Sequence, residues 1–356
     1  MEYQNLGSTG LKISRVVFGG AHIGEVVSQE KTKELVHAAW DAGVSTIYTG
    51  DDYNLGDGER FIGEAIKSRR DDVVIIAKTG YRVGAWTNYS KGGSPADGGE
   101  DYTNQRLGTL DHARLWSAGA APTSRGMSRK HLTAALEASL RRLQTDYVDV
   151  YCPHYWDPEV PVEETIATLH NFVLQGKVRY LSCSQHTPWQ LYRALWVSDS
   201  LKMSRYEAVQ ANLSLLERGP VQNELPALRE VGVSMLAGIT DAGGMLSGDY
   251  DRNSERPSGG GARQRYIDPF WTEAAFDAMD ILKDCAARIG RTVGEMAQAW
   301  VLAQEPVAAL MVGAHEPEDF DTPAAAASKP LSADELAEIN GVLPSIPVNV
   351  RPARVL

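Results

Sequence analysis

Short apolar runs alternate with longer amphipathic segments along most of this chain. Eight runs are rich in Val, Ile, Leu and Tyr, and most are followed by a segment with apolar residues at helical spacing. Most of the runs are apolar on both faces, which is typical of parallel strands covered by helices. The expected strands span 16–20, 44–48, 73–78, 147–153, 179–184, 206–211, 233–238 and 309–314.

The segments between these runs carry helix start and stop signals. Thr292 with Glu295, and Ser332 with Glu335, fit the capping box. Eight alternations of strand and helix predict an α/β fold, a closed (β/α)8 TIM barrel in one domain spanning residues 1–356. An open doubly wound sheet would give a similar local pattern. Expected helices span 30–42, 59–69, 128–143, 162–175, 187–197, 222–231, 272–289 and 293–303, and Gly43, Gly176, Gly232 and Gly290 stand at helix ends.

Three segments depart from the repeat. Residues 79–127 form a long loop after the third strand, and a second long loop, 239–268, follows the seventh. The stretch before the first strand predicts a β-hairpin that turns at Gly7 to Gly10 and closes the far end of the barrel. The first loop predicts a lid, because disordered segments rarely hold aromatics such as Tyr81, Trp86, Tyr89, Tyr102 and Trp116.

Charge and cysteine usage narrow the function classes. Lys plus Arg number 35 against 46 Asp plus Glu, a formal net charge of −11, so neither nucleic acid nor an anionic membrane surface is expected as a partner. No apolar run approaches the roughly 20 residues that span a bilayer. Three cysteines without CxxC spacing indicate neither a disulfide framework nor a thiolate zinc site, which favours a reducing, cytoplasmic location.

Polar residues that end the apolar runs are the candidates for chemistry, because barrel active sites lie at the C-terminal ends of the strands. Tyr53, Lys78 and His154 follow or end three successive strands. An ammonium favours the phenolate of a tyrosine, whose free pKa is about 10, and an imidazole can donate to the developing charge. Such a tyrosine can give or take a proton at a carbonyl or alcohol oxygen. Singly, each residue also fits a solvated, packing or loop position.

The chain resembles the aldo-keto reductases through an ordered set of motifs: "LGSTGLKIS", "YNLGDGERFIGEAI", "VVIIAKTG", "YVDVYCPHYWDPEVPVEET", "GKVRYLSCSQH", "VQANLSLLER" and "GGMLSG". The resemblance implies a (β/α)8 barrel that binds NADP(H) across the strand ends and interconverts a carbonyl and an alcohol. It implies Tyr53 as general acid and base, Lys78 lowering its pKa and His154 orienting the carbonyl. Ser184 and Gln210 would hold the nicotinamide carboxamide.

Several positions depart from the family's pattern. Tyr48 stands where the family has an aspartate that pairs with the lysine, and Asp51 and Asp52 are assigned to the turn. Near the last strand, Glu316 and Pro323 stand where the family contacts the 2′-phosphate and the adenine. The expected cofactor contacts are Ser184, Gln185 in place of an asparagine, Gln210, Gly238 in place of a stacking aromatic, Gly243, Gly244, Gly313 and His315.

Three hypotheses about the function remain open on the sequence. The first is a reductase whose cofactor contacts differ from those of the family and that acts on a sugar, a glycoside or an aromatic metabolite. The second is a redox-neutral lyase, dehydratase or isomerase, in which an unpaired Lys78 acts as a base and Tyr48 adds a second phenol. The third is a non-catalytic sensor or subunit. A metal site formed by His22, His154 and His186 is not expected, because no ligand spacing supports it and Lys78 would repel the cation. Oligomeric state and reaction direction are left open.

Overall fold

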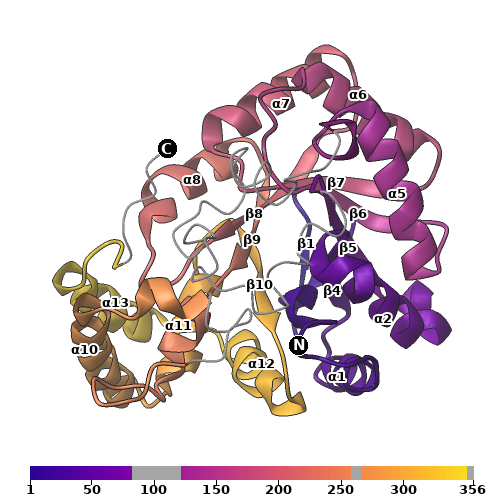
Figure 1. Cartoon of the computed structure of the whole chain (residues 1–356). Coiled ribbons are helices and arrows are strands. Elements are labelled where there is room, and N and C mark those ends of the chain that lie inside the picture. The colour runs from indigo at the N-terminus through magenta and orange to yellow at the C-terminus, as the bar shows by residue number, and fades with distance from the viewer. Residues whose placement is uncertain (82–121, 258–265, 351–356) are drawn as a thin grey trace, which may run out of the picture.

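Eight parallel strands close into a barrel in the order β10-β3-β4-β5-β6-β7-β8-β9 (Figure 1). The computed structural model describes residues 1–81, 122–257 and 266–350. The predicted (β/α)8 TIM barrel is confirmed, and each expected strand lies at its predicted place. The strands are β3 (Val16–Gly19), β4 (Thr46–Gly50), β5 (Val74–Thr79), β6 (Val148–Pro153), β7 (Val178–Ser184), β8 (Tyr206–Asn212), β9 (Ser234–Gly238) and β10 (Val307–Gly313).

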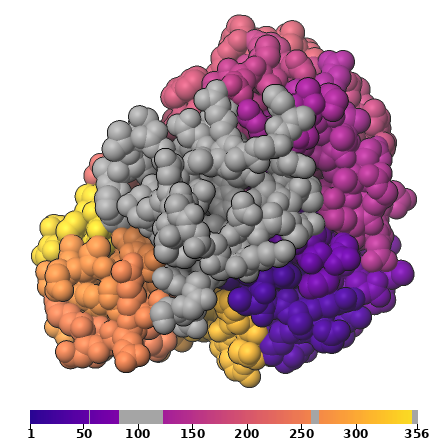
Figure 2. Space-filling model, in the orientation of Figure 1, coloured from indigo at the N-terminus to yellow at the C-terminus, as the bar shows by residue number. Residues whose placement is uncertain are grey.

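Helices surround the barrel, and Figure 2 shows their indigo, magenta and orange surfaces along the outline of the molecule. The α-helices are α1 (Gln29–Asp41), α2 (Asp57–Ile66), α5 (Arg129–Leu143), α6 (Val162–Leu174), α7 (Pro188–Ser200), α8 (Gly219–Glu230), α10 (Glu273–Ile289), α11 (Val293–Leu302), α12 (Asp321–Ser328) and α13 (Ala333–Val342). The 3-10 helices are η1 (Gly20–His22), η2 (Tyr53–Gly56), η3 (Lys67–Asp72), η6 (Pro122–Ser124), η7 (Ala242–Ser247), η8 (Asp268–Phe270), η9 (Pro317–Phe320) and η10 (Leu343–Ser345).

The predicted helix signals form as expected. Both capping boxes are present, with the Glu295 carboxylate accepting from the Thr292 backbone N–H at 2.9 Å. The four glycines at helix ends all have positive φ, for example +69° at Gly290. Helix α12 was not predicted. Its Pro323 lies in the first turn, where the missing N–H costs no hydrogen bond, and a run of alanines follows.

The N-terminal hairpin closes the end of the barrel at which the strands begin, as predicted. Strands β1 (Tyr3–Asn5) and β2 (Lys12–Ser14) pair antiparallel. The side chains of Leu6 and Ile13 are fully buried among the barrel-filling residues. The backbone N–H of Gly7 donates to the Ser234 hydroxyl at 2.9 Å, which ties the turn to the first residue of β9. This end is therefore filled, and the opposite end is the one available for chemistry.

Parts of the two long loops lie outside the described residues. The predicted lid aromatics Trp86, Tyr89, Tyr102 and Trp116 are among these, as are residues 258–265 of the second loop. The described part of the second loop is more regular than expected, since η7 begins four residues after the end of β9 and η8 precedes α10. The assignment of the whole chain to one domain stays a prediction.

Gly63 lies at a close contact between α2 and α5. A Cβ at this position would lie 2.5 Å from the backbone oxygen of Leu143. We expect Gly63→Ala to lower the free energy of unfolding by about 1–3 kcal/mol, because backbone atoms must shift to relieve the clash. Chemical denaturation measures this. The control is Gly341→Ala in α13, where nothing lies within 4 Å; it should raise stability by about 0.5–1 kcal/mol. Equal destabilisation in both variants would contradict the packing argument.

Candidate active site

The C-terminal ends of β4, β5 and β6 bring Tyr53, Lys78 and His154 to one rim. Lys78 pairs in register with Gly50 of β4 on one side and Cys152 of β6 on the other. The backbone N–H of His154 donates to the Thr79 carbonyl at 2.8 Å, which fixes the imidazole just beyond the strand. Tyr53 begins η2, three residues after the end of β4.

The three side chains contact one another through the lysine. Lys78 Nζ lies 2.9 Å from His154 Nε2 and 4.8 Å from the centroid of the Tyr53 ring. The Tyr53 and His154 rings are nearly perpendicular, with centroids 6.4 Å apart. The sequence therefore identified a real cluster, in which an ammonium faces both an aromatic ring and an imidazole nitrogen.

Burial dominates the electrostatics of this cluster. Desolvation lowers the pKa of Lys78 to about 8, although the Asp52 carboxylate opposes the shift. Burial, together with the charge of Lys78, lowers the pKa of His154 to about 4, so the imidazole is neutral at pH 7. Burial and the neighbouring Tyr266 raise the pKa of Tyr53 well above its usual value. This net direction is opposite to the expectation from the sequence, and it keeps the phenol protonated.

Asp51 and Asp52, which the sequence analysis assigned only to the turn, are both fully buried. Asp52 Oδ1 lies 3.5 Å from His154 Nδ1. Asp51 Oδ2 instead accepts from the Thr79 hydroxyl at 2.8 Å. Turn aspartates normally face water, so these two are exceptional. The one signal in the sequence was the pair of carboxylates placed directly between an apolar strand and the candidate tyrosine.

Asp51 belongs to a wider set of buried acidic groups. Glu59 of α2 is also fully buried, and its Oε2 accepts from Arg142 Nε at 2.7 Å. Burial, with the nearby charges of Asp52 and Glu59, raises the pKa of Asp51 well above its usual range. A carboxyl in this setting favours its protonated form, which limits the negative charge that it can place near Lys78.

Tyr48 points into the barrel. Its side chain is fully buried, and its hydroxyl lies 3.5 Å from the sulfur of Cys152. Lys78 Nζ lies 5.0 Å from the centroid of its ring. Burial is the main cause that raises the pKa of Tyr48 well above its usual value. Tyr48 thus fills the interior below the lysine, and its hydroxyl faces a thiol.

The ends of β7, β8 and β9 gather the residues expected at the nicotinamide. Ser184 Oγ donates to Gln210 Oε1 at 2.6 Å, and both side chains are buried. A Cβ at Gly238 would lie 2.7 Å from Gln210 Nε2, so the glutamine amide occupies the space beside that glycine. Gln185 and Ile239 follow their strands at φ +56° and +51°, conformations that are strained for side-chain-bearing residues. A hydroxyl beside an amide is a donor and acceptor set that fits a carboxamide.

Two backbone N–H groups near the start of the loop after β9 are already bonded within the chain. Gly243 and Gly244 have φ of +69° and +99°. The Gly243 N–H donates to Asp241 Oδ1 at 3.0 Å, and the Gly244 N–H donates to the Asp241 carbonyl at 3.1 Å. A carboxylate of the chain therefore already satisfies an N–H where an anion would bind.

The segment after β10 is arranged in the same way. The backbone N–H groups of His315 and Glu316 both donate to Asp319 Oδ2, at 2.7 and 3.0 Å. Glu316, which stands where the family contacts the 2′-phosphate, also pairs with Lys31 at 2.6 Å, and this ammonium offsets the carboxylate charge. Pro323 lies buried in α12. The carboxamide end of the expected site thus fits a nicotinamide, whereas at the phosphate end the N–H groups of Gly243, His315 and Glu316 are bonded to Asp241 and Asp319.

Gly313 leaves room for a pair of imidazoles. A Cβ there would lie 2.9 Å from His22 Nε2, and the His22 ring lies edge-on to that of His315 with centroids 4.4 Å apart. His186 lies elsewhere, with Nδ1 2.9 Å from the Ser184 carbonyl oxygen. Within residues 1–81, 122–257 and 266–350, no group of three or more His, Cys, Asp or Glu side chains could hold a metal ion.

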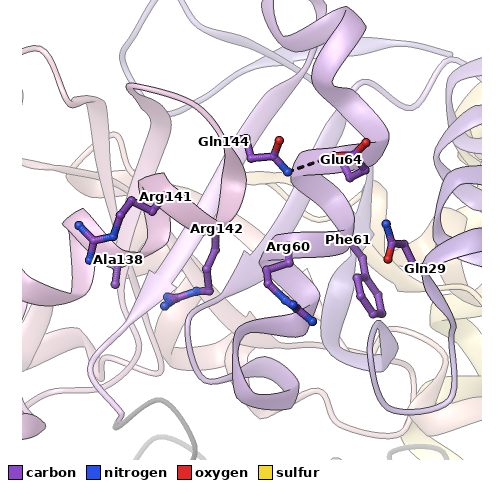
Figure 3. Close-up of a pocket in the computed structure, with 8 residues that line it drawn as sticks. All are labelled: Gln29, Arg60, Phe61, Glu64, Ala138, Arg141, Arg142 and Gln144. Carbon is purple, nitrogen blue, oxygen red and sulfur yellow. Dashed lines mark hydrogen bonds between the residues drawn. The ribbon is translucent and has the colours of Figure 1, made fainter.

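A surface pocket of about 520 Å³ lies away from this rim, between α2 and α5 (Figure 3). Gln144 donates to Glu64 across it at 3.1 Å. Its lining comes from the outer helical layer and the start of α1, so it is separate from Tyr53 and Lys78. The lining residues are Gln29, Arg60, Phe61, Glu64, Ala138, Arg141, Arg142 and Gln144.

The described chain has no helix that is both long enough and apolar enough to span a membrane. Cys152, Cys183 and Cys285 are all buried and unlinked. Of the three cysteines, Cys152 lies nearest to the candidate cluster, because its sulfur faces the Tyr48 hydroxyl inside the barrel.

Comparisons with known proteins identify the family and support the fold. The family model described as the aldo/keto reductase family matches residues 15–344. The chain is also similar to the solved structure of a glycerol dehydrogenase from Gluconobacter oxydans, with a TM-score of 0.76 and 23% sequence identity. That similarity covers 99% of this chain and 98% of the other. At this level of identity it supports the barrel fold alone.

Proposed function

The chain belongs to the aldo/keto reductase family, and from this premise we propose that it is an oxidoreductase that interconverts a carbonyl and an alcohol. The observation that carries the proposal is the contact of Lys78 with both Tyr53 and His154 at the open end of the barrel. A phenol beside an ammonium that an imidazole contacts can move a proton on a substrate oxygen.

Tyr53 acts as the proton donor in the direction of carbonyl reduction. Its raised pKa keeps the hydroxyl protonated until negative charge develops on the substrate oxygen. The ammonium of Lys78, 4.8 Å from the ring, then stabilises the phenolate that remains. In the direction of alcohol oxidation the same phenolate takes the proton back.

NADP(H) is the expected cofactor and would supply the hydride when bound. Ser184 and Gln210 would hold its carboxamide. The N–H groups that would face its phosphates are bonded to Asp241 and Asp319 instead. The proton transfer described above depends only on residues of this chain and holds for either nicotinamide nucleotide.

Cofactor binding provides the first test. We expect NADPH and NADH to quench the tryptophan fluorescence of the purified protein, with saturation at micromolar to millimolar concentration. Asp241→Asn should tighten both nucleotides about five-fold, because removing one like charge beside the pyrophosphate is worth about 1 kcal/mol. Isothermal calorimetry on the same variants gives the dissociation constants. The absence of quenching by millimolar nucleotide in both proteins would contradict the oxidoreductase proposal.

That outcome would favour a second function, a redox-neutral lyase, dehydratase or isomerase. The observation in its favour is that carboxylates of the chain bond the N–H groups at the phosphate end. With a pKa of about 8, Lys78 is close enough to neutral to act as a base. Product analysis with a β-hydroxy carbonyl compound and no added nucleotide tests this function directly.

A sugar, a glycoside or an aromatic metabolite remains the proposed substrate class. Trp156 lies edge-on to the exposed Trp189, with ring centroids 5.4 Å apart, and also contacts His186 at the end of β7. Flat aromatic faces near the strand ends suit a ring-shaped substrate. Tyr81 and Tyr155 stack on each other and are buried, so they support His154 from behind.

A cytoplasmic location stays a prediction, consistent with the three unlinked cysteines.

A further inference from the structure

Asp52 reaches the rim because the residue beneath it is a glycine. A Cβ at Gly50 would lie 2.8 Å from Asp52 Oδ1 and 3.4 Å from Lys78 Cβ. The Asp52 side chain therefore folds back over the end of β4, next to the stem of the lysine. Its carboxylate is fully buried and lies 3.5 Å from Nδ1 of His154. A buried carboxylate in this position has a strong electrostatic effect on any cation beside it.

The other nitrogen of the same imidazole faces the lysine. Lys78 Nζ lies 2.9 Å from His154 Nε2. An ammonium has three donors and no lone pair, so Nε2 must be the acceptor. A neutral imidazole has a single ring proton, which must then be on Nδ1 and point toward Asp52. The opposite tautomer would place two N–H donors face to face and a lone pair against a carboxylate.

We propose that Asp52 is a positioning residue, whose carboxylate holds the Nδ1–H tautomer of His154 and, through that ring, the charge and position of the Lys78 ammonium. Tyr48 stands where the family has an aspartate that pairs with the lysine. In this arrangement the Asp52 carboxylate supplies that negative charge instead. The arrangement also assigns His154 a new role. Its Nε2 accepts from Lys78, so the substrate oxygen meets the Tyr53 hydroxyl without an imidazole donor.

Several titratable groups face Lys78, so a test must separate the effect of the Asp52 charge on Lys78 from the effects of the others. Asp52 is the first of the charges that favour the ammonium, ahead of Cys152 and Asp51. Asp51 is the natural control, because it is adjacent, equally buried and bonded to Thr79 instead of His154. Within residues 1–81, 122–257 and 266–350, the titratable groups beside Lys78 are Tyr48 from β4, Asp51, Asp52 and Tyr53 after it, Cys152 from β6 and His154 after β6.

The first experiment needs no activity. In protein labelled with 15N-histidine, long-range 1H–15N correlation spectra report which ring nitrogen carries the proton, and His154→Gln assigns the signal. We expect the Nδ1–H tautomer in the wild-type protein. An Nε2–H tautomer would overturn the proposal, whatever reaction the protein catalyses and whether or not any variant folds.

The second experiment compares Asp52→Asn with Asp51→Asn by NMR titration of 15N-labelled lysine. Asp52→Asn should lower the pKa of Lys78 by about one unit, a ten-fold change in its protonation equilibrium. Asp51→Asn should change it by less than half as much. Equal shifts in the two variants, or no shift in Asp52→Asn, would overturn the proposal.

The kinetic consequence rests on the proposed oxidoreductase function. Asp52→Asn should lower kcat about ten-fold or more with KM within about two-fold, because the carboxylate does not touch the substrate. Asp52→Glu should recover part of kcat. If the wild-type protein shows no carbonyl reduction, the proposed function fails, whereas the tautomer and the pKa of Lys78 still decide the role of Asp52. Wild-type kcat in Asp52→Asn would overturn that role.

Discussion

Tyr53→Phe is expected to lower turnover by a factor of about 10² to 10⁴, the range that a positioned general acid contributes. The substitution removes only the hydroxyl. The ring keeps its place 4.8 Å from Lys78 Nζ and edge-on to His154, so the fold and the remaining cluster should be unaffected. Steady-state kinetics with a carbonyl substrate and a thermal unfolding curve together separate lost chemistry from lost structure. Unchanged turnover would mean that Tyr53 is not the proton donor.

Tyr48→Phe is the matched comparison, because it makes the same chemical change on the other side of Lys78. The Tyr48 hydroxyl faces the Cys152 sulfur inside the barrel. If the protein is an oxidoreductase, it should therefore lose far less activity with Tyr48→Phe than with Tyr53→Phe. A loss as large as that of Tyr53→Phe would instead support the redox-neutral hypothesis, in which two phenols share the proton transfer.

The barrel could be predicted from the sequence because each strand carries its own signal. The apolar run at 73–78, for example, becomes Val74–Thr79, and the capping boxes at Thr292 and Ser332 begin helices as expected. Helix α12 was missed, and its Pro323 is compatible with a helix only because it lies in the first turn. Helices and strands were thus predicted wherever an apolar run or a capping box within the segment decides the backbone conformation.

The site was predictable to the extent that its residues end strands. Lys78 and His154 were found on that ground, and the barrel brings their nitrogens within 2.9 Å. Asp52 was not found, because adjacency to Tyr53 in sequence indicated only a turn. Its direction depends on the missing side chain of Gly50, which is a property of the folded backbone. The hydrogen bond from the Gly243 N–H to the Asp241 carboxylate is likewise a property of the folded backbone, which the sequence does not show.

Lys78→Met should lower turnover about 10² to 10³-fold, since it removes the cation that faces the developing phenolate. If Lys78 acts through Tyr53, the double variant Tyr53→Phe with Lys78→Met should lose little more than Tyr53→Phe alone. Additive losses would show that the lysine acts on the substrate independently.

Lys78→Arg then separates the two proposed functions. A guanidinium keeps its charge at any working pH and cannot act as a base. A reductase that needs only a fixed cation should keep measurable activity with Lys78→Arg, above that of Lys78→Met. A lyase or dehydratase that uses the neutral lysine, whose pKa is lowered to about 8, should be as inactive with arginine as with methionine. Because both variants replace the same buried side chain, the ratio of their activities isolates the charge, and a ratio near one would exclude the cation as the basis of catalysis.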